Sequence, residues 1–253
     1  MQYKLLSIIC AVFTSLGVFA QNTTIKSGEK LVYAASYNMS GLMTTLAEVT
    51  METTKVPDKN LFHLNLTAST YTKWDSYFKI RDQYQSYVST KTLKPVLYYR
   101  NIDEGGYTKS EKYVFDYKNK VAKTTVQRRK KPETKKDVAI SLQTSDVVAT
   151  LYQLRNLNIS AAKPGTKVTL TILFDGKEIP VIVKYMAKET ISTDVFGKKE
   201  CYKLSISAKT DALKGKDENL LWLTADAKKI PVLIKFSIPV GNGQLKLTKA
   251  TGI

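Results

Sequence analysis

The sequence predicts a mostly β protein: a curved antiparallel meander sheet, half-barrel-like in shape, with one amphipathic helix packed against it. Three observations predict this fold. Apolar and polar residues alternate with period two along most of the chain, and short turn motifs separate the alternating segments. A single segment instead repeats its apolar residues at helical spacing. Short connections between alternating strands are typical of a meander and not of βαβ units.

Residues 1–20 have the pattern of a cleavable secretory signal peptide. A lysine near the start precedes the uncharged segment 5–19, and Ala20 precedes the expected cut before Gln21. An uncleaved anchor is disfavoured because the uncharged run is shorter than the roughly 20 residues of a membrane-spanning helix. Lipidation at Cys10 is disfavoured because too few apolar residues precede it. We therefore expect a periplasmic or otherwise exported chain that is soluble after cleavage and has no further membrane span.

The mature chain, 21–253, reads as one β domain with two strand blocks, 29–127 and 166–249. In the second block the apolar residues of 168–174 alternate with threonine, and Asp175-Gly176 then supplies a hairpin turn. Alternation of this kind is typical of antiparallel strands with one face in solvent. The blocks could be one sheet or two subdomains. One continuous curved sheet is favoured because no flexible linker flanks the segment between them.

That segment, about 145–157, is the predicted helix. Thr144 or Ser145 is the expected N-cap, Asp146 falls in the first turn, and Arg155 lies near the C-terminus, where a cation is favourable. We expect this helix to lie across the sheet and close its open side. Its apolar stripe consists of Val147, Val148, Leu151, Leu154 and Leu157.

The charge is strongly positive, with a net of +16 once residues 1–20, which hold one lysine and no acid, are removed. Such a charge favours an anionic neighbour, and outside the cytoplasm the candidates are lipid head groups, acidic glycans or an acidic envelope protein, not nucleic acid. The alternative is that the lysines are solvated and protect strand edges from pairing. Basic residues concentrate in 118–136, which we interpret as an exposed loop or strand end. The candidate anion-binding residues there are Arg128, Arg129, Lys130 and Lys131.

Aromatic residues concentrate between Phe62 and Tyr117, which hold 13 of the chain's 25. Tyrosine and tryptophan on a concave sheet face offer flat apolar area with a polar tip, which suits a lipid chain or a sugar ring. The alternative is that these aromatics are strand formers that pack the core. The candidate ligand-binding residues are Tyr71, Trp74, Tyr77, Tyr98 and Tyr113.

Signatures of catalysis are few. His63 is the one histidine and Cys201 the one mature cysteine, which are too few for a metal site built on these residue types or for an intramolecular disulfide. No nucleophile elbow, phosphate-binding loop or dinucleotide fingerprint occurs. We therefore predict no enzyme activity, cofactor or metal. The remaining catalytic option is a carboxylate pair, for which the candidates are Asp103 with Glu104 and Asp75 with Asp82.

The order of several motifs resembles the DUF3108 domain, a family of uncharacterised exported Gram-negative bacterial proteins. The match runs from the block 28–33 through the helix to the most specific block, 222–226, where Ala225 departs from the usual acid or small polar residue. The resemblance implies a curved antiparallel sheet similar to periplasmic half-barrels, which include lipoprotein carriers and capsule-associated proteins, and it implies no catalytic residues. Arg155 and Asp226 are a candidate buried pair.

Together these patterns favour a non-enzymatic envelope protein that binds an apolar or glycan ligand on the concave sheet face or serves as a scaffold. An enzyme with an unrecognised carboxylate site is one alternative. A purely structural module that binds a partner through the basic loop is the other.

Overall fold

The computed structural model describes residues 21–39, 41–208, 219–238 and 241–253, with the side chain of Ile238 left out. The predicted signal peptide lies outside these residues. The strands are β1 (Lys30–Met39), β2 (Leu42–Lys55), β3 (Leu61–Thr70), β4 (Arg81–Ser89), β5 (Pro95–Glu104), β6 (Tyr107–Asp116), β7 (Val121–Arg128), β8 (Thr134–Ala139), β9 (Thr144–Ser145), β10 (Lys167–Phe174), β11 (Lys177–Thr193), β12 (Gly197–Ala208), β13 (Leu220–Thr224), β14 (Pro231–Ile238) and β15 (Gly241–Thr251). The helices are α1 (Val147–Gln153) and the 3₁₀ helices η1 (Thr72–Trp74) and η2 (Leu154–Asn156).

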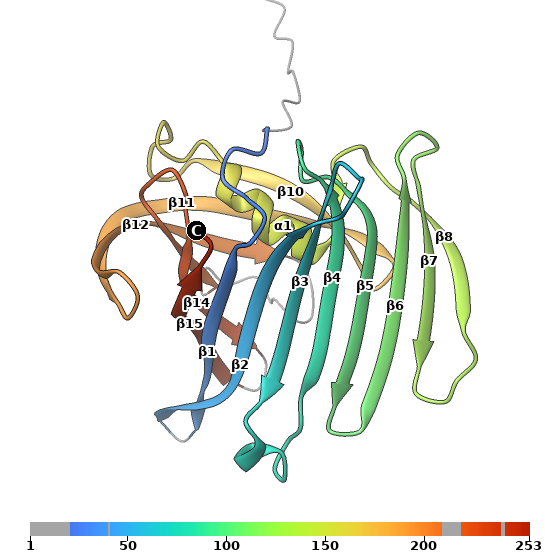
Figure 1. The fold of residues 1–253 in the computed structure, drawn as a ribbon, viewed down its shortest axis with the longest axis horizontal. Coiled ribbons are helices and arrows are strands. Elements are labelled where there is room, and N and C mark those ends of the chain that lie inside the picture. The colour runs from blue at the N-terminus through green and yellow to red at the C-terminus, as the bar shows by residue number, and fades with distance from the viewer. Residues whose placement is uncertain (1–20, 40, 209–218, 239–240) are drawn as a thin grey trace, which may run out of the picture.

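The described strands form one 15-stranded sheet, which confirms the predicted mostly β fold and the single curved sheet. Its order is β8-β7-β6-β5-β4-β3-β2-β1-β15-β14-β13-β12-β11-β10-β9, and each neighbouring pair is antiparallel except β9 with β10 (Figure 1). The two edge strands, β8 and β9, follow each other in the chain with only residues 140–143 between them. Because such a connection reaches at most about 17 Å, the sheet must curve until its edges approach each other.

The predicted helix lies within the curve of the sheet, where α1 contacts β3 and β4 from one half and β10 from the other (Figure 1). It is shorter than expected, because the α-helix ends at Gln153 and continues as one 3₁₀ turn. The prediction of Thr144 or Ser145 as N-cap is wrong. Asp146 is the N-cap, and its Oδ1 accepts a hydrogen bond of 2.8 Å from the Ala149 N–H.

The two edge strands, β8 and β9, were not predicted from the sequence. Residues 134–139 form β8, which pairs with β7, so the basic run 118–136 is a strand, a tight turn and a second strand, not one loop. Strand β9 is two residues long and parallel to β10. Sequence reasoning failed here because β8, with four of its six residues polar or charged, buries only Val138 and so lacks an apolar alternation.

The seam between the two halves is held by polar contacts at the β10–β11 turn. Asp175 in this turn lies 2.5 Å from Lys109 Nζ on β6 and 3.2 Å from Arg100 Nη1 on β5. Glu111 on β6 also contacts both cations, with distances of 2.9 Å to Lys109 and 3.1 Å to Arg100. Since Lys109 and Glu111 are buried, each charge has its partner and the tip of the hairpin is tied to the opposite half of the sheet.

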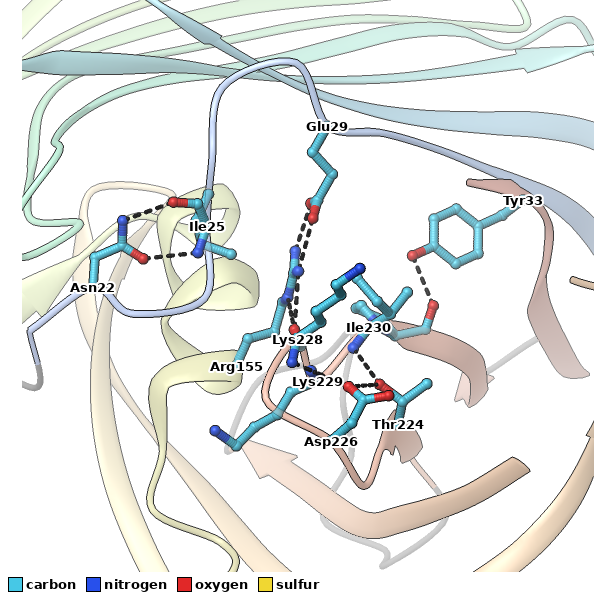
Figure 2. Close-up of polar contacts among 11 residues, drawn as sticks. Asn22, Ile25, Glu29, Tyr33, Arg155, Thr224, Asp226, Lys228, Lys229 and Ile230 are labelled. Carbon is cyan, nitrogen blue, oxygen red and sulfur yellow. Dashed lines mark hydrogen bonds and ion pairs between the residues drawn. The ribbon is translucent and has the colours of Figure 1, made fainter. Parts of the chain in front are cut away.

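A second polar cluster joins the N-terminal segment to the helix and to the β13–β14 turn (Figure 2). The guanidinium of Arg155 binds the Glu29 carboxylate and the carbonyl oxygen of Lys228. The predicted pairing of Arg155 with Asp226 is therefore wrong. Asp226 instead accepts hydrogen bonds from Thr224 and from the backbone N–H of Lys228, and so shapes the turn that presents the carbonyl to Arg155.

Candidate ligand-binding cavity

An apolar cavity of about 440 Å³ lies at the end of the sheet where β1 and β2 meet η1. It is partly open to the surface, and its described lining is almost wholly apolar. Its volume falls within the range of small-molecule sites in proteins. The lining residues are Ala35, Ser36, Tyr37, Met39, Leu46, Ala47, Thr70, Trp74, Tyr77, Phe78, Ile80 and Phe236.

The floor of the cavity is formed by small residues on the face of the sheet that carries the core. Ala35 and Ala47 are paired across β1 and β2, two residues beyond the core pair Tyr33 and Val49. Because alternate residues share a face, the floor continues the core surface. Two methyl groups stand where larger side chains fill the neighbouring layer, and this difference leaves room for a ligand.

The roof is the β3–β4 connection, which polar contacts fasten to the sheet. Trp74 Nε1 donates a hydrogen bond of 3.1 Å to the carbonyl oxygen of Thr45. Asp75 forms an ion pair of 2.5 Å with Arg81 and accepts a hydrogen bond from Thr70. The Arg81 guanidinium, with help from Thr70, holds the pKa of the Asp75 carboxyl below its usual value. The roof is therefore positioned before any ligand arrives.

Close backbone approach at two glycines completes the walls. The Phe78 ring lies against Gly105 of the β5–β6 turn, where an added Cβ would sit 2.8 Å from the ring. The Phe236 ring lies over Gly243 of β15, where an added Cβ would sit 2.5 Å from it. A side chain at either glycine would displace a ring that lines the cavity.

The structure divides the five predicted ligand-binding residues. Trp74 and Tyr77 line the cavity, and Tyr71 is exposed at the start of the same connection without lining it. Tyr98 and Tyr113 are buried side by side in the core, with ring centroids 5.3 Å apart. The aromatic residues that are concentrated in the sequence between Phe62 and Tyr117 therefore belong to two environments, the region of the cavity and the packed core.

Sequence reasoning missed most of the lining. Met39 and Tyr37 belong to the end of β1, whereas Phe236 comes from β14, about 200 residues later in the chain. They meet because β1 pairs with β15, which pairs with β14. No local pattern indicates that pairing, because any alternating strand can hydrogen-bond to any other.

The predicted pair of Asp75 with Asp82 does not form, because each of the two carboxylates has a different partner. Asp75 pairs with Arg81, whereas Asp82 is buried and lies near Glu104. Burial, followed by the charge of Glu104, raises the pKa of Asp82 to about 7. Asp82 Oδ1 accepts a hydrogen bond of 3.1 Å from the backbone N–H of Asp103. Neither Asp82 nor Glu104 lines the cavity, so this pair has no adjoining space for a substrate there.

The predicted anion-binding residues lie together at the tip of the β7–β8 hairpin. Arg128 ends β7, and Arg129, Lys130 and Lys131 form the turn, all of them exposed. The Arg129 guanidinium lies 5.3 Å from the centre of the Tyr107 ring on β6. Their positions leave four cations facing solvent at one end of the sheet.

His63 and Cys201, the remaining candidates for chemistry, contact other side chains or are buried in the protein. His63 stacks on Tyr87 at 4.6 Å between ring centres, and its Nε2 lies 2.9 Å from Gln85 Oε1. Cys201 is buried, and burial raises the pKa of its thiol to about 11.

Within the described ranges, no helix has the length and apolar character needed to cross a membrane.

A family model matches most of the chain, and one solved structure agrees with this fold. A family model described as "Protein of unknown function (DUF3108)" matches residues 32–248, which confirms the resemblance seen in the sequence. The solved structure of a beta-barrel-like protein of the domain of unknown function DUF1849 from Brucella abortus is 12% identical, with a TM-score of 0.60 over 88% of this chain and 96% of that chain. A candidate exported protein with a YmcC-like fold from Bacteroides fragilis NCTC 9343 is 9% identical, with a TM-score of 0.35 over 92% and 99% of the two chains. No curated protein matches the chain.

Proposed function

We propose that this chain, which belongs to the DUF3108 family, is an exported, non-enzymatic binding protein that holds an apolar chain, such as the acyl chain of a lipid, in the cavity under η1. The observation that carries the proposal is the lining of the cavity. The described lining is open to solvent and almost wholly apolar. An apolar ligand would bury this surface, and burial stabilises the complex by roughly 25 cal/mol for each Å² of apolar surface removed from water.

The lining favours an acyl chain over a glycan. A sugar ring needs hydrogen-bonding groups beside its aromatic platform, whereas Ser36, Thr70 and the tips of the aromatic side chains are the polar groups of the described lining. Among the described lining residues there is no carboxylate, histidine, lysine or thiol, so the hydroxyl groups of Ser36 and Thr70 have no side-chain base in the lining to activate them as nucleophiles. Binding, and not turnover, is the function that this chemistry supports.

Export is supported by the sequence pattern of residues 1–20. We infer a periplasmic or otherwise extracytoplasmic location, with the mature chain starting at Gln21. An intact mass corresponding to residues 21–253 from the envelope fraction would agree with this location. A mass that retains residues 1–20, or recovery in the cytoplasm, would contradict it.

The direct test is binding of a fluorescent fatty acid to the delipidated mature protein in the absence of membranes. Wild type is expected to bind it with saturation. Ala47→Phe, which fills the floor, is expected to weaken binding at least tenfold, whereas Ala139→Phe on the exposed edge of β8 is the matched control and should bind as wild type. Tyr77→Ser changes a lining side chain that is 80% exposed, so it tests the same cavity without disturbing the core.

Two results would contradict the proposal. One is an absence of saturable fatty-acid binding by folded wild type. The other is equal binding by wild type, Ala47→Phe and Tyr77→Ser, which would place the ligand elsewhere. Mass spectrometry of an organic extract from protein purified out of its own envelope then identifies the natural occupant.

A further inference from the structure

The four hairpin tips at one end of the first half of the sheet form a continuous surface. In an antiparallel meander alternate turns share an end, so the β1–β2, β3–β4, β5–β6 and β7–β8 connections lie together (Figure 1). Contacts join neighbouring tips. Trp74 binds the Thr45 carbonyl on β2, the Gly105 N–H donates to the Lys79 carbonyl at 2.8 Å, and the Arg129 N–H donates to the β6 backbone. We call this surface the tip face.

Apolar side chains gather on one side of the tip face. Of the twelve large apolar side chains that are exposed among the described residues, six belong to the β1–β2 and β3–β4 tips. Leu42 is 71% exposed, Tyr77 80% and Phe78 53%. Clusters of this kind mark interaction surfaces, because singly scattered apolar residues are normal and grouped ones are not. The six are Met39, Leu42, Met43, Tyr71, Tyr77 and Phe78.

Cations lie on the same face. Arg128, Arg129, Lys130 and Lys131 occupy the β7–β8 tip, and the exposed Lys73 and Lys79 flank the aromatic residues of the β3–β4 tip. Apolar side chains set beside several cations fit an anionic bilayer, since the apolar groups enter the boundary between head groups and acyl chains while the cations meet the head groups. Three of the exposed apolar residues of this face, Met39, Tyr77 and Phe78, also line the cavity, so we place the mouth of the cavity on this face.

We propose that the tip face docks on an anionic lipid bilayer, so that the cavity mouth meets the membrane and an acyl chain can enter the cavity directly from it. The loading of the chain rests on the proposed function, whereas the docking stands on the exposed apolar and basic residues alone. The charge complementarity and the position of the mouth favour a bilayer over a second copy of this basic chain, which would bring like charges together.

Flotation of the mature protein with vesicles tests the docking. Wild type is expected to float with phosphatidylcholine vesicles that contain one quarter phosphatidylglycerol, and much less with phosphatidylcholine alone. The variants Leu42→Ser/Met43→Ser and Arg128→Ser/Arg129→Ser/Lys130→Ser/Lys131→Ser should each bind the anionic vesicles at least tenfold more weakly. Neither Leu42 nor Met43 lines the cavity, so the first variant should bind free fatty acid as wild type does.

Matched controls exist at sites away from the tip face. Val168→Ser/Ile182→Ser removes two apolar side chains that are about as exposed as Met43. The four replacements Lys55→Ser, Lys59→Ser, Lys91→Ser and Lys118→Ser remove the same charge from the opposite end of the sheet. Both controls should float as wild type does.

Labelling gives an independent readout. Leu42→Cys can be modified with an environment-sensitive fluorophore while Cys201 stays buried. Anionic vesicles should shift its emission to shorter wavelength, and a label at Val168→Cys should not respond.

The outcomes separate the two proposals. Wild type that stays unbound to anionic vesicles, or tip variants that bind no worse than their controls, would overturn the docking even if fatty acid binds. A dimer that Leu42→Ser/Met43→Ser dissociates would likewise overturn it and assign the face to a second copy. Tip-dependent flotation without fatty-acid binding would retain the docking and remove the proposed function.

Discussion

Arg155 and Glu29 form a bidentate ion pair between residues 126 positions apart, with Nη1 2.6 Å from Oε1 and Nη2 2.8 Å from Oε2. Both side chains are buried, and the guanidinium also binds the carbonyl oxygen of Lys228 (Figure 2). The pair thereby joins the start of β1, the end of the helical segment and the β13–β14 turn.

Removing one partner of this pair should destabilise the fold strongly. Arg155→Ala leaves Glu29 buried without a counter-charge, so the free energy of unfolding should fall by about 3–5 kcal/mol. Replacing both residues, with Arg155→Met and Glu29→Leu, should recover much of that loss because no uncompensated charge remains. Urea unfolding followed by circular dichroism measures both. Lys30→Ala, which breaks the exposed pair with Glu52, is the control and should have a far smaller effect. Equal losses in Lys30→Ala and Arg155→Ala would refute this interpretation.

Asp146 should make the protein less stable as pH rises. Burial raises the pKa of its carboxyl to about 7, although hydrogen bonds from Ser86 and the Ala149 N–H oppose the shift. Between pH 4 and pH 7 the folded state therefore holds a proton that the unfolded state has released, and stability falls as pH rises through this window. Asp146→Asn keeps an N-cap acceptor and should flatten the slope while raising stability at pH 8.

Urea midpoints at intervals from pH 4.5 to 8 measure the effect, as the difference between wild type and Asp146→Asn. Asp82, whose pKa is also raised to about 7, contributes a slope of the same sign, so Asp82→Asn gives an independent second difference. Identical pH profiles for wild type and Asp146→Asn would show that Asp146 does not titrate in this range.

Asp175 should control how firmly the β10–β11 hairpin is held to the opposite half of the sheet. Asp175→Asn leaves Lys109 and Arg100 with Glu111 as their one remaining carboxylate among the contacts described, which weakens the attachment of the hairpin tip. Hydrogen exchange should quicken in β10 and β11 and stay unchanged in β2 and β3. Lys177→Ser, an exposed change two residues away, is the control. Uniform quickening across the sheet would indicate global destabilisation in place of local release.

Cys201 should be unreactive in the folded protein. Burial raises the pKa of its thiol to about 11, so the reactive thiolate is scarce at pH 8, and the side chain is buried as well. A thiol reagent should modify it on the time scale of minutes only after urea unfolding. Ser192→Cys is the comparison, because position 192 is exposed and a thiol there should react at once. The neighbouring Thr193 is buried and would not serve. Fast modification of native wild type would contradict the burial.

The period-two strands, the turns between them and the one helical segment could be predicted from the sequence, because each follows from the side-chain pattern of consecutive residues. The sequence also identified Trp74 and Tyr77, which lie in one connection. The sequence-based predictions failed in two places, each for its own physical reason. The mostly polar strand β8 has no apolar alternation from which it could be predicted. Arg155 pairs with Glu29 and not with Asp226 because the closure of the sheet sets which distant segments meet.

The position of the cavity depends on contacts between strands that are far apart in the sequence. Its floor depends on the pairing of Ala35 with Ala47. Its far wall depends on the sheet order β1-β15-β14, which brings Phe236 of β14 near β1. Its roof depends on the hydrogen bond between Trp74 of η1 and Thr45 of β2. Backbone hydrogen bonds fit any pair of extended strands, so the choice of partners depends on how the whole set of apolar faces is buried at once. That choice is a property of the closed sheet and not of any segment within it.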